Sequence, residues 1–211
     1  YGSAWRYRHR ARLSVREVAK KGTVLVGFHE KRSSFIADMK SCEILPKRVS
    51  DLLVPLRELI NSLSLRKKLP QIELAVTDEA LALVLRVLEK PTADDEAKLR
   101  QFQKDYGVDF WYQPKGPESI YPMDPENAAR LKLHHRETGG EVVFRPTDFT
   151  QVNHRLNEVM VTRALRLLHL EPSSKVIDFF CGLGNFTLPL ATRTAKVLGI
   201  EGSSELVERA R

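Results

Sequence analysis

Strict alternation of polar and apolar positions opens the chain. Residues 5–13 read Trp-Arg-Tyr-Arg-His-Arg-Ala-Arg-Leu, a two-residue period that predicts a β-strand. A basic turn at 20–23 and an apolar run at 24–29 predict the returning strand of a hairpin. Residues 35–39 predict a third short strand.

Helical spacing begins after this strand-rich segment. Leucines and isoleucine recur at helical intervals between residues 46 and 65, and Pro55 indicates either a kink or a start near Val54. Further strands are expected at 72–77, 81–88 and 108–113, with a helix from the N-cap Thr92 to Tyr106, where Gly107 stops it. Alternating strands and helices predict an α/β domain.

A proline-rich loop at 114–125 separates this part from a second predicted hairpin, with strands at 131–135 and 141–144. His134 and His135 are adjacent, so in a strand they point to opposite faces, and we predict packing or surface roles instead of a joint metal site. A helix is expected from Arg155 to Leu168, with Asn153 as its N-cap.

The most informative pattern lies near the C-terminal end. Residues 176–180 form a short apolar run typical of a buried parallel strand, followed by Gly182 and Gly184, which permit a sharp turn close to a ligand. A helix at 186–192 and a strand at 196–200 follow, and the strand ends at Glu201. An acid about 20 residues after such glycines can accept hydrogen bonds from ribose hydroxyls.

The glycine pattern is Gly-x-Gly-x-Phe and lacks the third glycine that lets a helix pack tightly under a pyrophosphate. It therefore favours a ligand with a ribose but no phosphate, such as S-adenosylmethionine. The alternative is an ordinary strand–turn–helix in which the glycines only make the bend. Asp178 before the turn and Glu201 after the next strand favour the cofactor site.

Charge and cysteine content narrow the class of protein. Lys plus Arg number 34 against 27 for Asp plus Glu, a net charge of +7 that suits a polyanionic partner. Two cysteines make no disulfide framework, which indicates a cytoplasmic protein. The sequence contains no apolar run of membrane-spanning length. We expect no membrane or DNA partner and a monomer.

Four arginines fall on one face of the predicted first strand. They are Arg6, Arg8, Arg10 and Arg12. Each guanidinium can bind a phosphate with two hydrogen bonds, so the row predicts an RNA-binding ribbon. The alternative is a solvated face in which arginine serves solubility.

The chain has 211 residues, begins Tyr-Gly-Ser without Met, and has only two strands after Pro172. Two parallel strands alone do not make a stable sheet, so we expect a piece of a longer protein, truncated at both ends. The predicted domains are 1–145, a central α/β domain that contacts RNA, and 146–211, the start of a Rossmann-like S-adenosylmethionine-binding domain.

Three motifs carry a family resemblance: YRHRARLSVR, FRPTDFTQVN and DFFCGLGNFTLPLA. Together they resemble the RNA uracil-5-methyltransferases, most closely the branch that acts on 23S ribosomal RNA and carries an iron–sulfur cluster. The resemblance implies a methyltransferase in rRNA processing that methylates C5 of a uridine. Alternatives are a transfer-RNA uracil-5-methyltransferase and, from another class, a non-catalytic RNA-binding module.

Carried over by position, the implied cofactor contacts are Gln151, Phe180, Asn185 and Glu201, while Asp178, Gly182 and Gly184 shape the turn. For Asn153, helix capping is the preferred role. In this family the nucleophilic cysteine and the general base lie beyond the cofactor motif. We therefore name no catalytic residue in this chain, do not assign Cys181 as the nucleophile, and expect the fragment alone to be inactive.

Cys42 has two interpretations. Alone it is a small buried residue. The resemblance implies that it is the distant fourth ligand of a 4Fe-4S cluster in the parent protein. Such a cluster needs four thiolates, and the chain has only Cys42 and Cys181. We therefore expect no cluster in this fragment.

Overall fold

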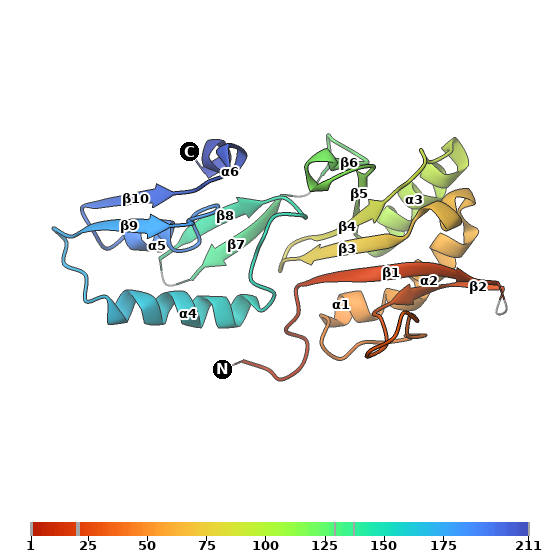
Figure 1. Cartoon of the computed structure of the whole chain (residues 1–211), viewed down its shortest axis with the longest axis horizontal. Helices are drawn as coiled ribbons and strands as arrows, with labels where there is room; N and C mark the ends of the chain where they lie inside the picture. The colour runs from red at the N-terminus through yellow and green to blue at the C-terminus, as the bar shows by residue number, and fades with distance from the viewer. Residues whose placement is uncertain (1, 20–21, 129, 137, 211) are drawn as a thin grey trace. The chain divides into compact units, whose positions relative to one another are not determined.

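The computed structural model describes residues 2–19, 22–128, 130–136 and 138–210, and has mixed α/β architecture (Figure 1). No helix among these described residues is long and apolar enough to cross a membrane. The elements in chain order are β1 (Arg10–Val18), β2 (Thr23–Gly27), α1 (Lys47–Ser50), α2 (Leu53–Ser62), η2 (Ser64–Lys68), β3 (Gln71–Val76), β4 (Leu81–Arg86), α3 (Ala93–Tyr106), β5 (Asp109–Gln113), η3 (Pro117–Ser119), β6 (Tyr121–Pro122), β7 (Leu131–His135), β8 (Gly140–Phe144), α4 (His154–Leu167), β9 (Lys175–Phe179), α5 (Thr187–Ala191), β10 (Lys196–Ile200) and α6 (Ser204–Ala210).

The chain forms two compact units. The N-terminal unit contains Ser3–Leu131 and Arg145–Val152, and the C-terminal unit contains Lys132–Phe144 and the described part of Asn153–Arg211. The predicted domain boundary after residue 145 differs from this division, because the β7–β8 hairpin groups with the later segment while Arg145–Val152 groups with the earlier one.

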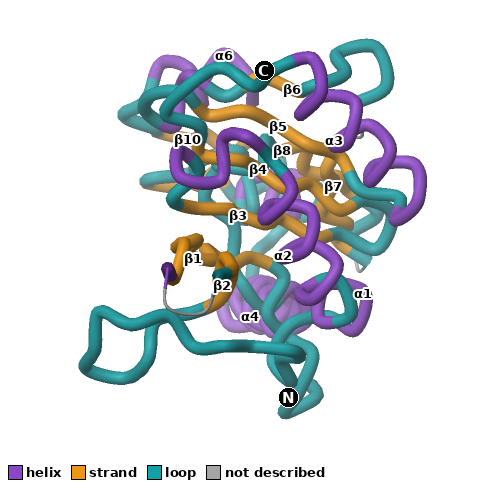
Figure 2. The backbone as a smooth tube through the Cα atoms, turned by 90° about the vertical axis from the view of Figure 1, so that its right-hand side faces the viewer, coloured by secondary structure: helices purple, strands orange, loops and turns teal. Residues whose placement is uncertain are grey.

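The N-terminal unit is built on a six-stranded sheet in the order β2-β1-β3-β4-β5-β6. All neighbours are antiparallel except β4 and β5, which are parallel and are connected through α3. Figure 2 shows α2 and α3 as two purple coils running beside the orange strands. The predicted hairpin of β3 and β4 and the strand β5 are confirmed. The continuous burial of β3 and β4 explains their apolar runs.

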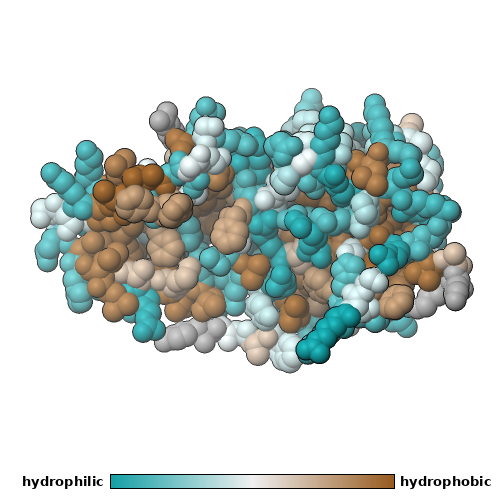
Figure 3. All heavy atoms as spheres, in the orientation of Figure 1, coloured by the Kyte–Doolittle hydropathy of each residue, from teal (hydrophilic) through white to brown (hydrophobic). Residues whose placement is uncertain are grey.

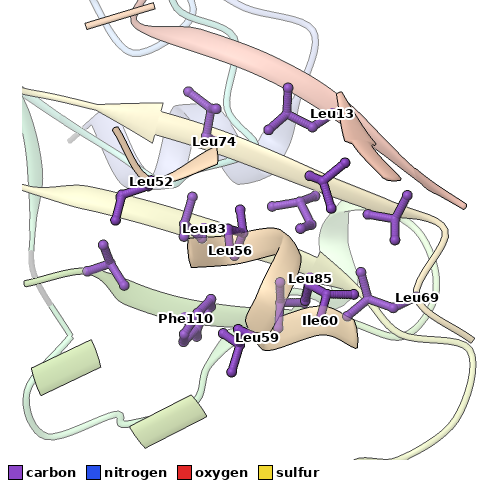
Figure 4. Close-up of a cluster of buried hydrophobic side chains, with 14 of the residues drawn as sticks. Leu13, Leu52, Leu56, Leu59, Ile60, Leu69, Leu74, Leu83, Leu85 and Phe110 are labelled. Atoms are coloured by element: carbon purple, nitrogen blue, oxygen red, sulfur yellow. The ribbon is translucent and has the colours of Figure 1, made fainter. Parts of the chain in front are cut away.

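Leucines from α2 meet leucines from the sheet in one hydrophobic core. Leu56, Leu59 and Ile60 point from the helix toward the strands (Figure 4). Leu83 and Phe110 face them and are almost fully buried. Each buried side chain of this size contributes about 1.5–3 kcal/mol to folding, so this interface stabilises the unit.

Helix α3 has the predicted boundaries for the predicted reasons. The Thr92 hydroxyl accepts a hydrogen bond from the Asp95 backbone N–H, and the Asp95 carboxylate accepts one from the Thr92 N–H, which together make a capping box. Gly107 ends the helix in the left-handed conformation at φ 59°. Asp95 also accepts hydrogen bonds from Ser64, so the cap joins α3 to η2.

The C-terminal unit contains a small parallel sheet and a hairpin. β9 and β10 pair in parallel, and β7 and β8 form a separate two-stranded sheet. The predicted N-cap is confirmed, because the Asn153 side chain accepts a hydrogen bond from the Leu156 N–H at 2.9 Å. Val161 and Leu165 of α4 pack with Leu190 of α5.

One face of the β9–β10 sheet exposes apolar side chains. Ile177, Phe179, Leu198 and Ile200 alternate with inward-facing residues and lie 42–64% exposed. In Figure 3, brown side chains gather over the region where β9 and β10 lie in Figure 1. An apolar strip of this kind is a surface on which further structure can pack.

Three local predictions need correction. The first strand begins at Arg10, not at residue 5, because residues 6–8 bond to the backbone of Glu43 and Ile44 and Arg6 has a φ of 61°. Residues 35–39 form no strand, only an isolated bridge between His29 and Ile36. The helix predicted over 46–65 is divided into α1, α2 and η2. The alternative of a helix start near Val54 is confirmed, because α2 begins at Leu53 and has Pro55 in its first turn, where the missing N–H costs nothing.

Candidate cofactor site

The turn after β9 has the backbone geometry that its sequence predicts. Gly182 and Gly184 have φ values of 55° and 92°, in the region that favours glycine. Phe180 also lies there, at φ 60°, although it carries a bulky side chain. A left-handed conformation at a non-glycine residue costs about 1–3 kcal/mol and is enriched at ligand sites.

Glu201, at the end of β10, faces this turn. Its carboxylate accepts hydrogen bonds from the backbone N–H of Gly182 at 3.0 Å and of Ser203 at 2.9 Å. These backbone donors, Ser203 first, hold the pKa of Glu201 below its usual value. The group is therefore ionised at neutral pH, and a carboxylate with two N–H partners still has lone pairs for two hydroxyls.

Asp178 and Asn185 are fixed by side-chain hydrogen bonds. The Thr187 hydroxyl donates to Asp178 at 2.6 Å, which joins β9 to the first turn of α5. Asn185 and the buried Asn157 of α4 exchange two amide hydrogen bonds, at 2.8 and 2.9 Å. This pairing orients the Asn185 side chain and leaves its second N–H hydrogen and one lone pair for another partner.

Phe180 is the most exposed apolar residue of the turn. Its side chain is 90% exposed, and it follows directly on β9. An exposed aromatic ring on strained backbone offers a flat apolar surface for a base. The structure thus brings Asp178, Phe180, Gly182, Gly184 and Glu201 together around one turn.

Gln151 lies in the N-terminal unit, on the segment Arg145–Val152, with an exposed side chain. The segment is attached to β1 and the residues before it. Arg10 donates from its guanidinium to the carbonyl oxygen of Asp148. The backbone N–H of His9 donates to the carbonyl oxygen of Val152 at 2.7 Å.

The arginine row differs from the predicted ribbon. Arg6 pairs with Glu43 at 2.9 Å, and both Arg10 and Arg12 pair with Glu73, at 2.6 and 3.3 Å. Arg10 is 14% exposed and Arg12 is 64% exposed. Internal ion pairs therefore occupy Arg6 and Arg10, because their carboxylate partners lie on neighbouring segments.

A small hollow lies beside Arg12 within the N-terminal unit. Its volume is about 240 Å³, and the residues that line it are Arg8, Arg10, Ala11, Arg12, Glu73, Phe149, Thr150 and Val152. Nε of Arg8 and the hydroxyl of Thr150 are buried there, and neither has a hydrogen-bond partner among the described residues. Cationic and hydroxyl donors beside the exposed ring of Phe149 suit a nucleotide.

The two cysteines lie in different units and are free thiols. Burial, and then the neighbouring Asp178 and Glu201, raise the pKa of Cys181, which keeps it protonated and unsuited to nucleophilic attack. Its sulfur also fills the space beside Gly199, where an added Cβ would lie 2.8 Å from Sγ. Within the described ranges no group of three potential metal ligands occurs, and two thiols do not fit a 4Fe-4S cluster.

His134 and His135 point to opposite faces of β7, as predicted. His134 contacts Glu141 at 3.2 Å, whereas His135 is buried. His135 lines a cavity of about 590 Å³ with α4 that contains none of the predicted cofactor residues.

Sequence reasoning did not find Glu73, Asn157 and Thr187. Each is a polar residue that supports a predicted residue from another element. The sequence contains one feature that could have identified Glu73, which is the only charged residue between Gln71 and Thr77. No comparable feature of the sequence identifies Asn157 or Thr187.

The chain matches known proteins over nearly its whole length. The family model described as tRNA (Uracil-5-)-methyltransferase matches residues 2–211. The 23S rRNA (uracil(1939)-C(5))-methyltransferase RlmD of Ralstonia pickettii is 56% identical over 99% of the chain, and that of Burkholderia lata is 58% identical over 100%. The chain spans 46% and 45% of those relatives, about half of their length.

A solved structure has the same fold. The tRNA (uracil-54, C5)-methyltransferase of Pyrococcus abyssi, determined in complex with S-adenosyl-L-homocysteine, aligns with a TM-score of 0.73 at 18% identity. The alignment covers 99% of this chain and 52% of that one. By its match to the family model and to these relatives, the chain belongs to the tRNA (uracil-5-)-methyltransferase family.

Proposed function

We propose that the full-length protein transfers a methyl group from S-adenosylmethionine to C5 of a uridine in 23S ribosomal RNA. The observation that carries the proposal is the turn after β9. Gly182 lies there in the left-handed region beside the ionised Glu201, and Phe180 exposes its ring next to them. Relatives named as 23S rRNA uracil methyltransferases support the choice of RNA.

The turn residues have distinct roles in this proposal. Glu201 accepts hydrogen bonds from the ribose hydroxyls, Phe180 packs on the adenine, and Asn185 offers its remaining amide donor. Asp178, Gly182 and Gly184 keep the backbone of the turn in shape. Gln151 contributes an amide that can both donate to and accept from the methionine end of the cofactor.

Bound S-adenosylmethionine supplies an electrophilic methyl group, and this chain's residues hold the cofactor. C5 of uracil is a poor nucleophile until a thiolate adds at C6, so the reaction also needs a reactive cysteine and a general base. Cys181 does not fit the first role because its pKa is raised. The family resemblance implies that the nucleophilic cysteine and the general base lie beyond the cofactor motif, and we therefore expect this chain alone to transfer no methyl group.

Arg12, Arg8 and Thr150 are the strongest candidates for RNA contacts, since they line the hollow beside β1. Arg6 and Arg10 stay predicted RNA contacts, but each is already engaged by a carboxylate. A 23S rRNA substrate supports a cytoplasmic location, and we propose this location together with a monomeric state.

The test uses full-length protein purified without oxygen, unmodified ribosomal and transfer RNA, and methyl-labelled S-adenosylmethionine. Mass spectrometry of the nucleosides should find the label on C5 of uridine in the 23S RNA. Label in transfer RNA only would favour the related transfer-RNA activity. RNA binding with no label in either would favour a non-catalytic binding module.

We also propose Cys42 as one ligand of a 4Fe-4S cluster in the full-length protein. Its partial burial at the edge of the core, with its backbone held by Ser50 and Arg6, supports a fixed thiol. Iron and sulfide analysis of anaerobic full-length protein should give four of each. Cys42→Ser should lower these values, and unchanged values would exclude Cys42 as a ligand.

A further inference from the structure

The ion pair of Arg10 and Glu73 lies between β1 and β3 and is one of the least exposed in the N-terminal unit. The guanidinium of Arg10 lies 2.6 Å from the Glu73 carboxylate, and the two side chains are 14% and 10% exposed. Neither residue belongs to the turn after β9. An ion pair withdrawn from water repays its desolvation only through good geometry and further hydrogen bonds, so the other contacts of Arg10 are informative.

The second contact of Arg10 is with the segment that carries Gln151. One nitrogen of the guanidinium binds Glu73, and the other donates to the carbonyl oxygen of Asp148. The planar guanidinium thus connects a buried carboxylate on β3 to the backbone three residues before Gln151. Arg12 shares Glu73 but has no hydrogen bond to this segment in the described structure.

A second attachment lies directly after Gln151. The backbone N–H of His9 donates to the carbonyl oxygen of Val152 at 2.7 Å. The buried Thr150 precedes Gln151, whereas Gln151 itself is exposed. Gln151 is therefore held between two points of attachment, from Asp148 to the first residue of β1 and from Val152 to the residue before it.

We propose that Arg10 and Glu73 are positioning residues, which set the backbone at Gln151 and thereby the orientation of its amide. The inference rests on the proposed function, because it takes Gln151 as a cofactor contact. It gives Arg10 an internal role in addition to the RNA contact predicted for it. Glu73 acts by keeping the Arg10 guanidinium in the plane that reaches Asp148.

The test compares full-length wild-type protein with Glu73→Gln and Arg10→Lys. Glu73→Gln keeps the shape but removes the charge, and Arg10→Lys keeps the charge but removes the planar fork. Asp38→Asn is the matched control, because Asp38 forms a 2.6 Å ion pair with Arg57 in the same unit, away from residues 145–152. The readouts are the Kd for S-adenosylhomocysteine by calorimetry, the KM for S-adenosylmethionine, kcat, the RNA affinity and the Tm.

We expect Glu73→Gln to raise the Kd and the KM about tenfold, the size of one lost hydrogen bond to a charged group. The RNA affinity should change less than about twofold. Asp38→Asn should lower the Tm less, because Asp38 is 43% exposed, and should leave the Kd unchanged. If Glu73→Gln does not fold, Arg10→Lys should show the same raised Kd.

A double-mutant cycle with Gln151→Ala identifies the route of the effect. If the ion pair acts through Gln151, adding Glu73→Gln to Gln151→Ala should raise the Kd less than about twofold further. If the two substitutions raise the Kd independently, so that their fold-changes multiply, the inference is overturned. It is also overturned if Glu73→Gln lowers the Tm but leaves the Kd for S-adenosylhomocysteine unchanged. An Arg10→Lys protein that loses only RNA affinity would overturn it as well. The proposed function fails separately, when the wild-type protein neither binds the cofactor nor labels uridine.

Discussion

The backbone N–H of Gly182 donates a hydrogen bond to the carboxylate of Glu201 at 3.0 Å. This contact joins the turn after β9 to the end of the neighbouring strand β10. A single acid is therefore held against the glycine turn by a backbone hydrogen bond of the chain itself. A group that its own fold holds in place loses less entropy when it binds a ligand.

Replacing Glu201 by Ala should weaken the binding of S-adenosylhomocysteine to the full-length protein by about 10- to 100-fold, because the charged acceptor is worth about 1.5–3 kcal/mol. Calorimetry measures this directly. Glu205→Ala removes the same charge from α6, where Glu205 lies 3.9 Å from Arg209 on the surface. Equal losses in the two variants would contradict a specific role for Glu201.

Gly182→Ala should cost about 1–2 kcal/mol of stability and reduce cofactor affinity, because φ is 55°. Nothing lies within 4 Å of an added Cβ, so the cost is conformational. Gly182→Asn should lose less, since asparagine tolerates this region. Gly202→Ala is the control, because a Cβ added at Gly202 also meets open space but the backbone there is not left-handed. Urea unfolding compares the stabilities of the three variants.

Thr92→Ala should destabilise the N-terminal unit by about 1 kcal/mol through the loss of an N-cap. Thr92→Ser keeps the hydroxyl that accepts from the Asp95 N–H and should retain most of the stability. Urea midpoints followed by circular dichroism give the difference. If Ala and Ser behave alike, the capping hydrogen bond contributes nothing.

Because Asp95 is the other half of the capping box, we expect the N-terminal unit to lose stability in acid. Burial raises the pKa of Asp95, but hydrogen bonds from Ser64 and Thr92 outweigh this and hold the pKa below the usual 3.8. The stabilisation is therefore present above about pH 4 and is lost as pH falls through the folded-state pKa. Asp95→Asn should flatten this part of the pH profile of the urea midpoint, whereas the surface variant Asp94→Asn should keep it.

We expect the stability of the C-terminal unit to depend on pH through His135. Burial lowers its pKa from 6.5, with Glu158 opposing the shift, so below that pH the unfolded chain binds more protons than the folded one. Stability should fall as pH drops below about 6.5 and level off below the folded-state pKa. His135→Gln should remove this slope in thermal unfolding, while His134→Gln, on the opposite face of β7, should keep it.

Arg12→Gln should weaken RNA binding by the full-length protein and reduce its dependence on salt concentration, because one phosphate contact contributes a log–log slope of about 0.7–0.9. Arg12 is the most exposed of the ion-paired arginines at the start of the chain. Lys104→Gln on α3 makes the same change of charge elsewhere in the unit. An unchanged salt slope for Arg12→Gln would remove it from the RNA interface.

The sequence by itself determined features that depend on neighbouring residues. Thr92 and Gly107 set the ends of α3, Asn153 caps α4, and the glycines after β9 take left-handed conformations, because caps and turns are decided within a few residues. The motif around Gly182 was also sufficient to predict that the acid after the next strand, Glu201, lies at the glycine turn.

Only the tertiary structure decided which charges are used internally. Alternation from residue 5 predicted four equivalent arginines, but Glu43 and Glu73 engage Arg6 and Arg10, and the strand begins only at Arg10. The pairing of Asn157 with Asn185 joins residues 28 positions apart. Such contacts depend on long-range packing, and a local pattern records only which side chains are available to make them.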